Sequence, residues 1–218
     1  PIAEDEYLVL TTGEDSYNWL GGDMVLALDS SGEEILRLPG YGITGNSAYV
    51  SNGMIVNENT PLVLYTEYED GASDDSDYAS AQMGIYSLKD RKWIVEPARQ
   101  SVTLFSDSVY MIGSDVGNLY RTDGTCIEEG AEDVTVQGNF IISRRAVYDK
   151  TGQLLLMIQE NESVWTVLYD EILINEYFSD GSHYTKCVNA QGETIWIEQS
   201  GLTWTGGEAG WRIYYSWN

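Results

Sequence analysis

Short runs of apolar residues alternate with turn residues along the chain. The pattern is clearest where Val147-Tyr148 precedes Asp149-Lys150-Thr151-Gly152 and Leu154–Leu156 follows. The same strand–turn–strand unit recurs over Leu26–Leu36 and over Lys186–Trp196. Runs of about four to eight apolar, β-branched or aromatic residues between Gly, Asn or Asp are typical of β-strands. Their repetition predicts an all-β repeat protein.

The turns between these strands share one chemistry. Asp or Asn at the first position accepts hydrogen bonds from the backbone that follows, and Gly at the fourth takes a positive φ without a steric clash. Such a turn joins two antiparallel strands through a bulge. With one tighter and one weaker version, the chain holds five predicted hairpins, with turns at Asp29–Gly32, Ser87–Asp90, Thr122–Gly124, Asp149–Gly152 and Asn189–Gly192.

The spacing of the five turns is nearly regular. With Gly32, Asp90, Gly124, Gly152 and Gly192 as markers, the intervals are 58, 34, 28 and 40 residues. The long first interval contains an acidic segment that we interpret as a loop insertion at about 69–80. After each of the first four hairpins comes a strand containing Val or Ile, and then a second apolar strand. We expect these second strands at Ala48–Val50, Ser108–Tyr110, Asn139–Ile141 and Glu171–Leu173.

Regular units of three or four short strands are typical of the blades of a β-propeller. We therefore predict a single domain over 1–218 that forms a propeller of about five short blades. The terminal strands, Tyr7–Leu10 and Trp211–Tyr215, would meet, because a ring must close to leave no blade with an open edge. A β-sandwich of two stacked sheets is the alternative architecture.

Two segments carry a resemblance to known repeats. Gly84–Tyr86 and Gly117–Gly124 resemble repeats of bacterial WG-repeat proteins, and also related propeller-like repeats of secreted or lipid-anchored bacterial proteins. The resemblance extends over most of residues 20–200, although the chain has no Trp-Gly pair and no Trp-Asp mark of WD40 blades. It implies a binding or scaffolding role rather than catalysis, and it supplies no catalytic residue.

The charge of the chain limits its partners. Eleven basic and 35 acidic residues give a formal net charge of −24. Nucleic acids and anionic membranes should be repelled, because phosphate contacts need Lys and Arg. No stretch approaches the roughly 18 apolar residues of a membrane span. The chain begins at Pro1 without an initiator Met, so we expect an exported protein whose targeting segment is missing, located outside the cell or at its surface, with a lipid anchor on that segment as one mode of attachment.

Cysteine and histidine offer little chemistry. Cys126 and Cys187 each lie in a strand-like apolar run, which favours buried free thiols over a disulfide. His183 is the only histidine, so a multi-histidine metal site is excluded, and no Gly-x-Ser-x-Gly motif accompanies it. We interpret His183 as a solvated turn residue and expect no enzymatic activity.

Two groups of residues are weak candidates for a site. Asp70, Asp74, Asp75 and Asp77 in the acidic insertion are candidate Ca²⁺ ligands, although we favour a solvated, self-repelling loop as their explanation and expect no cofactor. Trp19 and Trp204 adjoin Gly-rich segments, where an exposed ring could stack on a sugar or anchor a partner. We assign most other Trp and Tyr residues to the core. Asn161-Glu162-Ser163 also matches a glycosylation sequon.

These features predict a non-catalytic, exported interaction or ligand-binding module whose partner is a protein or a glycan. The alternative is a carbohydrate-binding module or a degenerate glycoside hydrolase. The paired carboxylates that such a hydrolase needs carry little weight here, because 35 acidic residues produce such pairs by chance. We expect no nucleic-acid partner and no direct insertion into a membrane.

Overall fold

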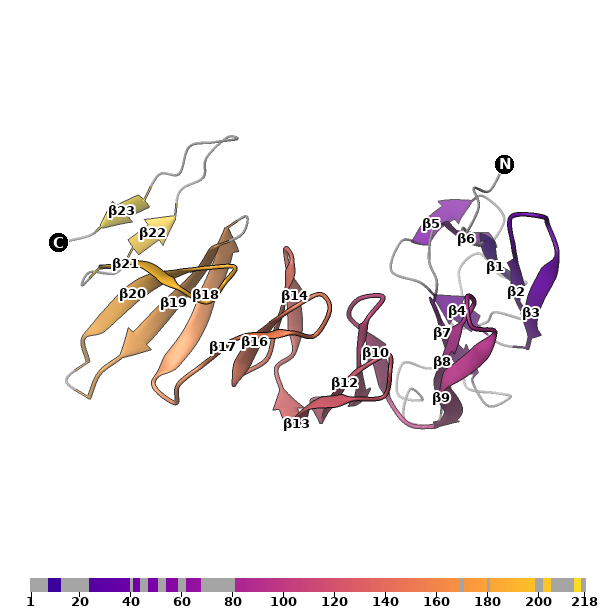
Figure 1. Cartoon of the computed structure of the whole chain (residues 1–218), viewed down its shortest axis with the longest axis horizontal. Coiled ribbons are helices and arrows are strands. Elements are labelled where there is room, and N and C mark those ends of the chain that lie inside the picture. Colours follow the sequence, from indigo (N-terminus) through magenta and orange to yellow (C-terminus); the bar gives the residue numbers. More distant parts are fainter. Residues whose placement is uncertain are drawn as a thin grey trace. The chain divides into compact units, whose positions relative to one another are not determined.

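The computed structural model has an all-β fold (Figure 1). Its described residues form strands and turns and contain no helix, which confirms the all-β prediction. Within them, no segment has the length and apolar character of a membrane-spanning helix. The structure describes residues 8–12, 24–39, 41–43, 47–50, 54–58, 62–67, 81–168, 171–179, 181–198, 202–204 and 214–216.

The chain divides into two compact units, Pro1–Gly130 and Ala131–Asn218. The first unit contains sheets A, B and most of C. Sheet A has the strand order β3 (Glu34–Leu38), β2 (Met24–Leu28), β1 (Leu8–Thr12), β6 (Met54–Glu58), β5 (Ser47–Val50). Sheet B has the order β4 (Tyr41–Ile43), β7 (Leu62–Glu67), β8 (Gln82–Ser87), β9 (Lys92–Arg99). Sheet C has the order β10 (Val102–Leu104), β11 (Val109–Gly113), β12 (Val116–Arg121), β13 (Cys126–Glu132).

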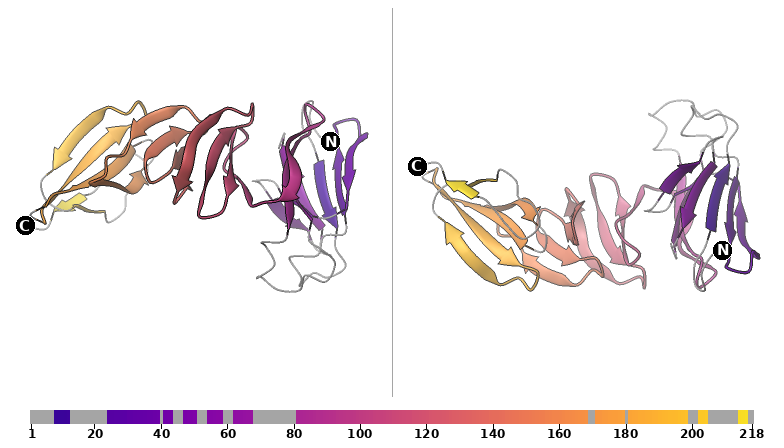
Figure 2. Two further views of the ribbon diagram at one scale, coloured as in Figure 1. Left: turned by 90° about the horizontal axis from the view of Figure 1, so that it is seen from below. Right: turned by 90° about the horizontal axis from the view of Figure 1, so that it is seen from above.

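The second unit contains sheets D, E and F, whose strands are antiparallel neighbours (Figure 2). Sheet D has the order β14 (Thr135–Gln137), β15 (Phe140–Ile142), β16 (Ala146–Asp149), β17 (Leu154–Met157). Sheet E has the order β18 (Glu162–Leu168), β19 (Glu171–Tyr177), β20 (His183–Asn189), β21 (Thr194–Glu198). Sheet F pairs β22 (Leu202–Trp204) with β23 (Tyr214–Ser216). The expectation of a single domain over 1–218 stays a prediction.

All five predicted hairpins are present, one in each of sheets A to E. They are β2–β3, β8–β9, β12–β13, β16–β17 and β20–β21. The Asp149 carboxylate accepts hydrogen bonds from the backbone N–H groups of Thr151 and Gln153, at 2.8 and 2.9 Å. Gly152 takes the left-handed conformation with a φ of 79°. Local turn chemistry therefore accounts for these hairpins. The hairpin of sheet B differs, because Arg91 holds the left-handed position there, with a φ of 53°.

The four second strands expected after the hairpins are all present, and three of them pair with the strand just before them. β10 pairs with β11, β14 with β15, and β18 with β19. The fourth, at Ala48–Val50, is confirmed as a strand: it forms β5, which pairs with β6, and β6 continues sheet A by pairing with β1. β7 is the actual neighbour of β4. An inserted strand pair therefore contributes to the long first interval. The acidic segment at about 69–80 lies outside the described residues.

Apolar side chains join neighbouring sheets within each unit. One core cluster holds Val25 and Ala27 of sheet A with Val63 of sheet B. A second joins sheets B and C. In the second unit, a cluster of buried residues packs sheet D against sheet E: Phe140, Ile142, Val147, Ile158, Ile172, Ile174 and Val188. Removal of these apolar side chains from water makes the largest favourable contribution to the packing of each pair of sheets.

The described strand pairing does not close a ring. β1 pairs with β2 and β6, whereas β23 pairs with β22. Among the described strands β1 is paired on both edges and does not pair with β23, and the predicted meeting of the chain ends stays a prediction. What the structure establishes is a series of small antiparallel sheets with paired cores.

Candidate functional site

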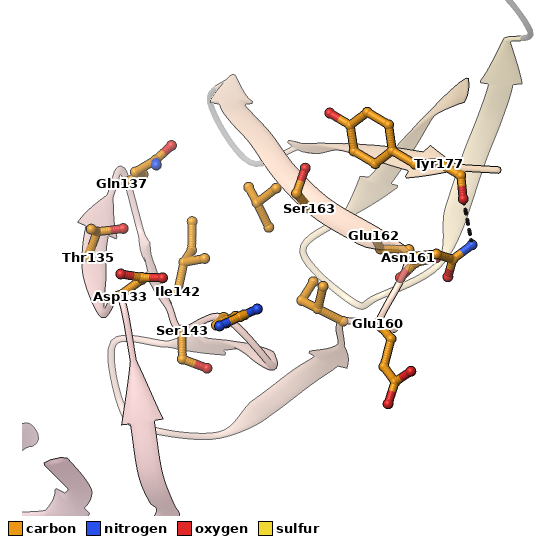
Figure 3. A pocket seen from close by; sticks show the side chains of 13 residues that line it. Asp133, Thr135, Gln137, Ile142, Ser143, Glu160, Asn161, Glu162, Ser163 and Tyr177 are labelled. Carbon is orange, nitrogen blue, oxygen red and sulfur yellow. Dashed lines mark hydrogen bonds between the residues drawn. The ribbon is translucent and has the colours of Figure 1, made fainter. Parts of the chain in front are cut away.

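A cleft of about 530 Å³ lies between sheets D and E, within the second unit. Its volume is in the range of about 300–1,000 Å³ that is usual for ligand sites. Figure 3 shows residues of β14 on one side and residues of β18 and the end of β19 on the other. Polar side chains dominate the walls: Asp133, Thr135, Gln137, Glu160, Asn161, Glu162 and Ser163.

The floor of the cleft is buried and mostly apolar. Ile142, Ser143 and Ile158 are 6%, 3% and 8% exposed. Ser143 is held by its own turn, because its hydroxyl donates to the carbonyl of Ala146 at 3.3 Å and accepts from the N–H of Arg145 at 3.2 Å. Ile142, at the end of β15, and Ile158, just after β17, belong to the core between sheets D and E. The floor is therefore fixed by the packing of the two sheets.

The β18 wall is fixed by hydrogen bonds at the start of the strand (Figure 3). The side-chain amide of Asn161 donates to the carbonyl of Tyr177 at 3.2 Å, and the N–H of Tyr177 donates to the carbonyl of Asn161 at 2.8 Å. Glu162 accepts from the N–H of Gln159 at 3.0 Å and also pairs with Lys186. The Glu162 side chain is only 4% exposed, so its charge is neutralised within the protein.

The opposite wall comes from β14 and the residue that leads into it. Thr135 and Gln137 are two positions apart and so share one face of the strand. Asp133 takes a left-handed conformation with a φ of 54°, which Asp adopts more readily than most residues. This conformation redirects the chain between β13 and β14.

Charges at the rim of the cleft are mainly negative. Within the described part of the chain, the carboxylates of Asp133 and Glu160 have no hydrogen-bond or ion-pair partner. The one guanidinium on the lining, that of Arg144, pairs with Glu132 at 2.8 Å. The side chain of Tyr177 is half exposed at the same rim. The cleft thus offers hydrogen-bonding groups, an aromatic ring and uncompensated negative charge.

The sequence-predicted candidates lie elsewhere. Trp19, Asp70, Asp74, Asp75 and Asp77 fall outside the described residues, and they stay predictions. Trp204 is in β22, where its backbone pairs opposite Tyr214; its side chain is outside the description. Among the described residues, no group of three metal-ligating side chains is present. Of the residues that line the cleft, only Asn161–Ser163 were singled out from the sequence, as a possible glycosylation sequon.

His183 begins β20, as the turn ahead of it indicated, and its ring is half-buried. Its centroid lies 5.9 Å from that of Tyr177, so the histidine supports the aromatic rim of sheet E. Neither cysteine forms a disulfide. Cys187 is buried as predicted, but the predicted burial of Cys126 is wrong: it is exposed, because it begins the edge strand β13 immediately after a turn.

Comparisons with known proteins give no family. No protein-family model matches the chain, and no curated protein matches it. The crystal structure of BamB from Moraxella catarrhalis is similar at 14% identity and a TM-score of 0.30, over 91% of this chain and 73% of BamB. The V. cholerae biofilm matrix protein Bap1 is similar at 9% identity and a TM-score of 0.29, over 91% of this chain and 39% of Bap1.

At these TM-scores neither structure assigns a fold family or a function to the chain. The chain also spans well under half the length of Bap1. The resemblance to WG-repeat proteins, noted in the sequence, likewise stays a prediction. The functional argument therefore depends on the cleft itself.

Proposed function

We propose that this protein is a non-catalytic interaction module that binds a ligand in the cleft between sheets D and E. The observation that supports the proposal is the lining of that cleft. Hydroxyl, amide and carboxylate groups on its walls surround a fixed apolar floor. A concave site with a few placed polar groups over apolar residues is the usual form of a binding site.

Catalysis is not part of the proposal, and neither is a cofactor. Two polar side chains of the cleft are engaged in holding the fold: Ser143 in its turn, and Glu162 with Lys186. Calcium binding by the acidic segment stays the alternative. A calorimetric titration that gives heat at millimolar calcium would overturn the cofactor-free reading.

A propeller arrangement of the sheets, and a location outside the cell, belong to the same proposal. Three successive four-stranded meanders, sheets C, D and E, support the first point. The acidic, Lys-poor composition supports the second. An experimental structure with two stacked sheets would favour the sandwich instead.

A protein partner is the leading choice, and a glycan is the second candidate. The half-exposed ring of Tyr177 beside Asn161 specifically favours a glycan, because aromatic faces stack on sugar rings while amides bond hydroxyls. Tyr177 thus joins Trp19 and Trp204 as a candidate ring for stacking on a sugar.

Occluding the cleft tests the proposed function. Ser163 is exposed on the cleft wall, so Ser163→Trp should fill the space, and Ser114→Trp on an exposed turn of the first unit is the matched control. A random peptide library and a glycan array are each screened with the wild type and both variants. We expect binding that Ser163→Trp weakens by about ten-fold or more, equivalent to about 1.4 kcal/mol. Binding that is insensitive to Ser163→Trp would refute the site.

A further inference from the structure

The edge of β18 that faces the cleft is open. Among the described strands, β18 pairs only with β19. Glu162, Ser163 and Val164, the first three residues of β18, all line the cleft without a gap, and so do Glu160 and Asn161 of the turn before the strand. Because side chains alternate between the two faces of a strand, one face could line the cleft only with every second residue. The continuous run therefore shows that the edge of the strand, and not one of its faces, borders the cleft.

The backbone groups on this edge follow from the pairing with β19. The N–H of Tyr177 donates to the carbonyl of Asn161, and antiparallel partners alternate between bonded and non-bonded pairs. Glu162 and Val164 therefore direct their backbone groups away from β19. The N–H of Glu162 already donates to the carbonyl of Gln159 at 3.0 Å. The carbonyl of Glu162 and both backbone groups of Val164 remain directed toward the cleft.

A β-bulge in β18 limits the length of the strand edge that is available for regular pairing. The register of β18 against β19 shifts between Val164 and Thr166. Bulges disrupt the regular pairing pattern of a strand and often end it. Only the first part of β18, beside the cleft, thus offers regular pairing to another strand.

From these observations we infer that the cleft binds a short extended polypeptide segment carrying Lys or Arg, which adds to the free edge of β18. This inference rests on the proposed function and names its partner. An edge with unpaired backbone groups is a template for an added strand, and alternate side chains of that strand supply the specificity. The uncompensated carboxylates of Asp133 and Glu160 flank the space and complement cationic side chains.

The first test selects a random displayed peptide library on the full chain. We expect the enriched peptides to carry Lys or Arg at alternating positions, because alternate side chains of an added strand face the same way. Synthetic copies of these peptides then give affinities by fluorescence anisotropy. Enrichment without basic residues would overturn the inference.

The second test separates the backbone from the side chain at Val164. Val164→Pro removes the outward N–H, and a proline is tolerated on an edge strand where that group faces solvent. Val164→Ala keeps the N–H and loses the same packing against the core between sheets D and E. We expect the selected peptides to bind Val164→Pro about ten-fold more weakly than Val164→Ala. Should Val164→Pro fail to fold, peptides with N-methyl groups at alternate amides test, on the wild type, the complementary bonds that peptide N–H groups donate to the backbone carbonyls of the β18 edge.

The third test concerns charge. Asp133→Asn with Glu160→Gln removes two negative charges, and Asn accepts the left-handed conformation of residue 133. Asp115→Asn, at an exposed turn of the first unit, is the control. We expect the double variant to bind about ten-fold more weakly and to lose most of the salt dependence of binding, while the control is unchanged.

The outcomes separate the inference from the proposed function. Equal binding to Val164→Pro and Val164→Ala, or glycan hits alone, would refute the added strand while cleft-dependent binding survives. If Ser163→Trp changes neither peptide nor glycan binding, the proposed function itself is wrong. Basic peptides that lose affinity with both Val164→Pro and the double carboxylate variant support the inference.

Discussion

A single side chain at or near the start of each hairpin turn accepts hydrogen bonds from the backbone that follows. Because this residue is Asp in one turn and Asn in another, the chain itself shows which substitution the turn tolerates. Asp149 and Asn189 hold equivalent positions, and each side-chain oxygen accepts from two backbone N–H groups. Asp149→Ala should lower the free energy of unfolding by about 1–2 kcal/mol, since it removes these hydrogen bonds. Asp149→Asn should cost less than about 0.5 kcal/mol, because Asn189 already performs this role. Urea denaturation measures both, and equal losses would show that the charge matters more than the bonding geometry.

Two buried tyrosines in the first unit make the fold sensitive to alkali. Burial raises the pKa of Tyr65 well above its ordinary value of 10.0, and the Glu67 carboxylate raises it further. Burial likewise raises the pKa of Tyr110. A folded-state pKa above the unfolded value gives stability that is complete below the unfolded pKa and is lost as the pH rises past it.

We therefore expect cooperative unfolding above about pH 10, with tyrosinate absorbance rising in the same transition as the loss of circular dichroism. Tyr65→Phe should reduce this alkaline sensitivity, whereas Tyr177→Phe, at a half-exposed position, should not. Tyrosinate absorbance that is complete before the fold is lost would contradict the assignment.

Sheet E is held together by an ion pair that crosses its second strand. Lys186 in β20 reaches Glu162 in β18, with side-chain exposures of 18% and 4%. Glu162→Gln leaves the half-buried ammonium without its partner and should cost about 3 kcal/mol. Replacing both residues by Met should recover most of that loss, because apolar residues of similar size need no compensating charge. The measurement is the free energy of unfolding in urea, and full stability of Glu162→Gln would show that the pair is dispensable.

The elements that depend only on nearby residues could be predicted from the sequence. The five hairpins could be predicted because each depends on residues within one turn, such as Asp149 and Gly152. The pairing of β1 with β6 joins residues more than forty positions apart, and no local signal marks it. The cleft could not be predicted for the same reason: β14 and β18 come together only through the packing of sheets D and E.

The packing of these two sheets also explains one glycine that turn chemistry alone does not. A Cβ added to Gly192 would lie 2.4 Å from the carbonyl oxygen of Leu155 in β17. The turn of sheet E thus rests directly on a strand of sheet D, and Gly is required there both by its φ of 80° and by this contact. The turn pattern in the sequence indicates the positive φ, but the contact with Leu155 depends on the packing of the two sheets and could not be predicted from it.

Charge dominates the behaviour of the chain as a whole. With a formal net charge of −24, self-repulsion should destabilise the folded state at neutral pH and low salt. Exposed pairs such as Arg144–Glu132, with side chains 70% and 39% exposed, offset little of this, since such pairs contribute at most about 1 kcal/mol. Added salt should therefore raise the melting temperature at pH 7 by screening the repulsion.

Acidification should first stabilise the fold and then unfold it. Protonation of exposed carboxylates lowers the net charge, so the melting temperature in low salt should rise as the pH falls from neutral toward about 5. Below about pH 5, the protonation of carboxylates that are stabilised in the folded state opposes the gain from reduced repulsion. The hydrogen bond from Ser31 lowers the pKa of Asp29, the backbone N–H of Thr125 lowers that of Asp123, and Arg37 lowers that of Glu34.

A lowered folded-state pKa gives stability that is present above the unfolded pKa and lost as the pH falls through the folded one. The melting temperature should thus pass through a maximum near pH 5 and fall steeply below about pH 4. Scanning calorimetry over this range in low and high salt checks both parts, with the salt effect expected to shrink as the net charge approaches zero. A melting temperature that falls steadily from pH 7 downward would show that the turn carboxylates outweigh the repulsion throughout.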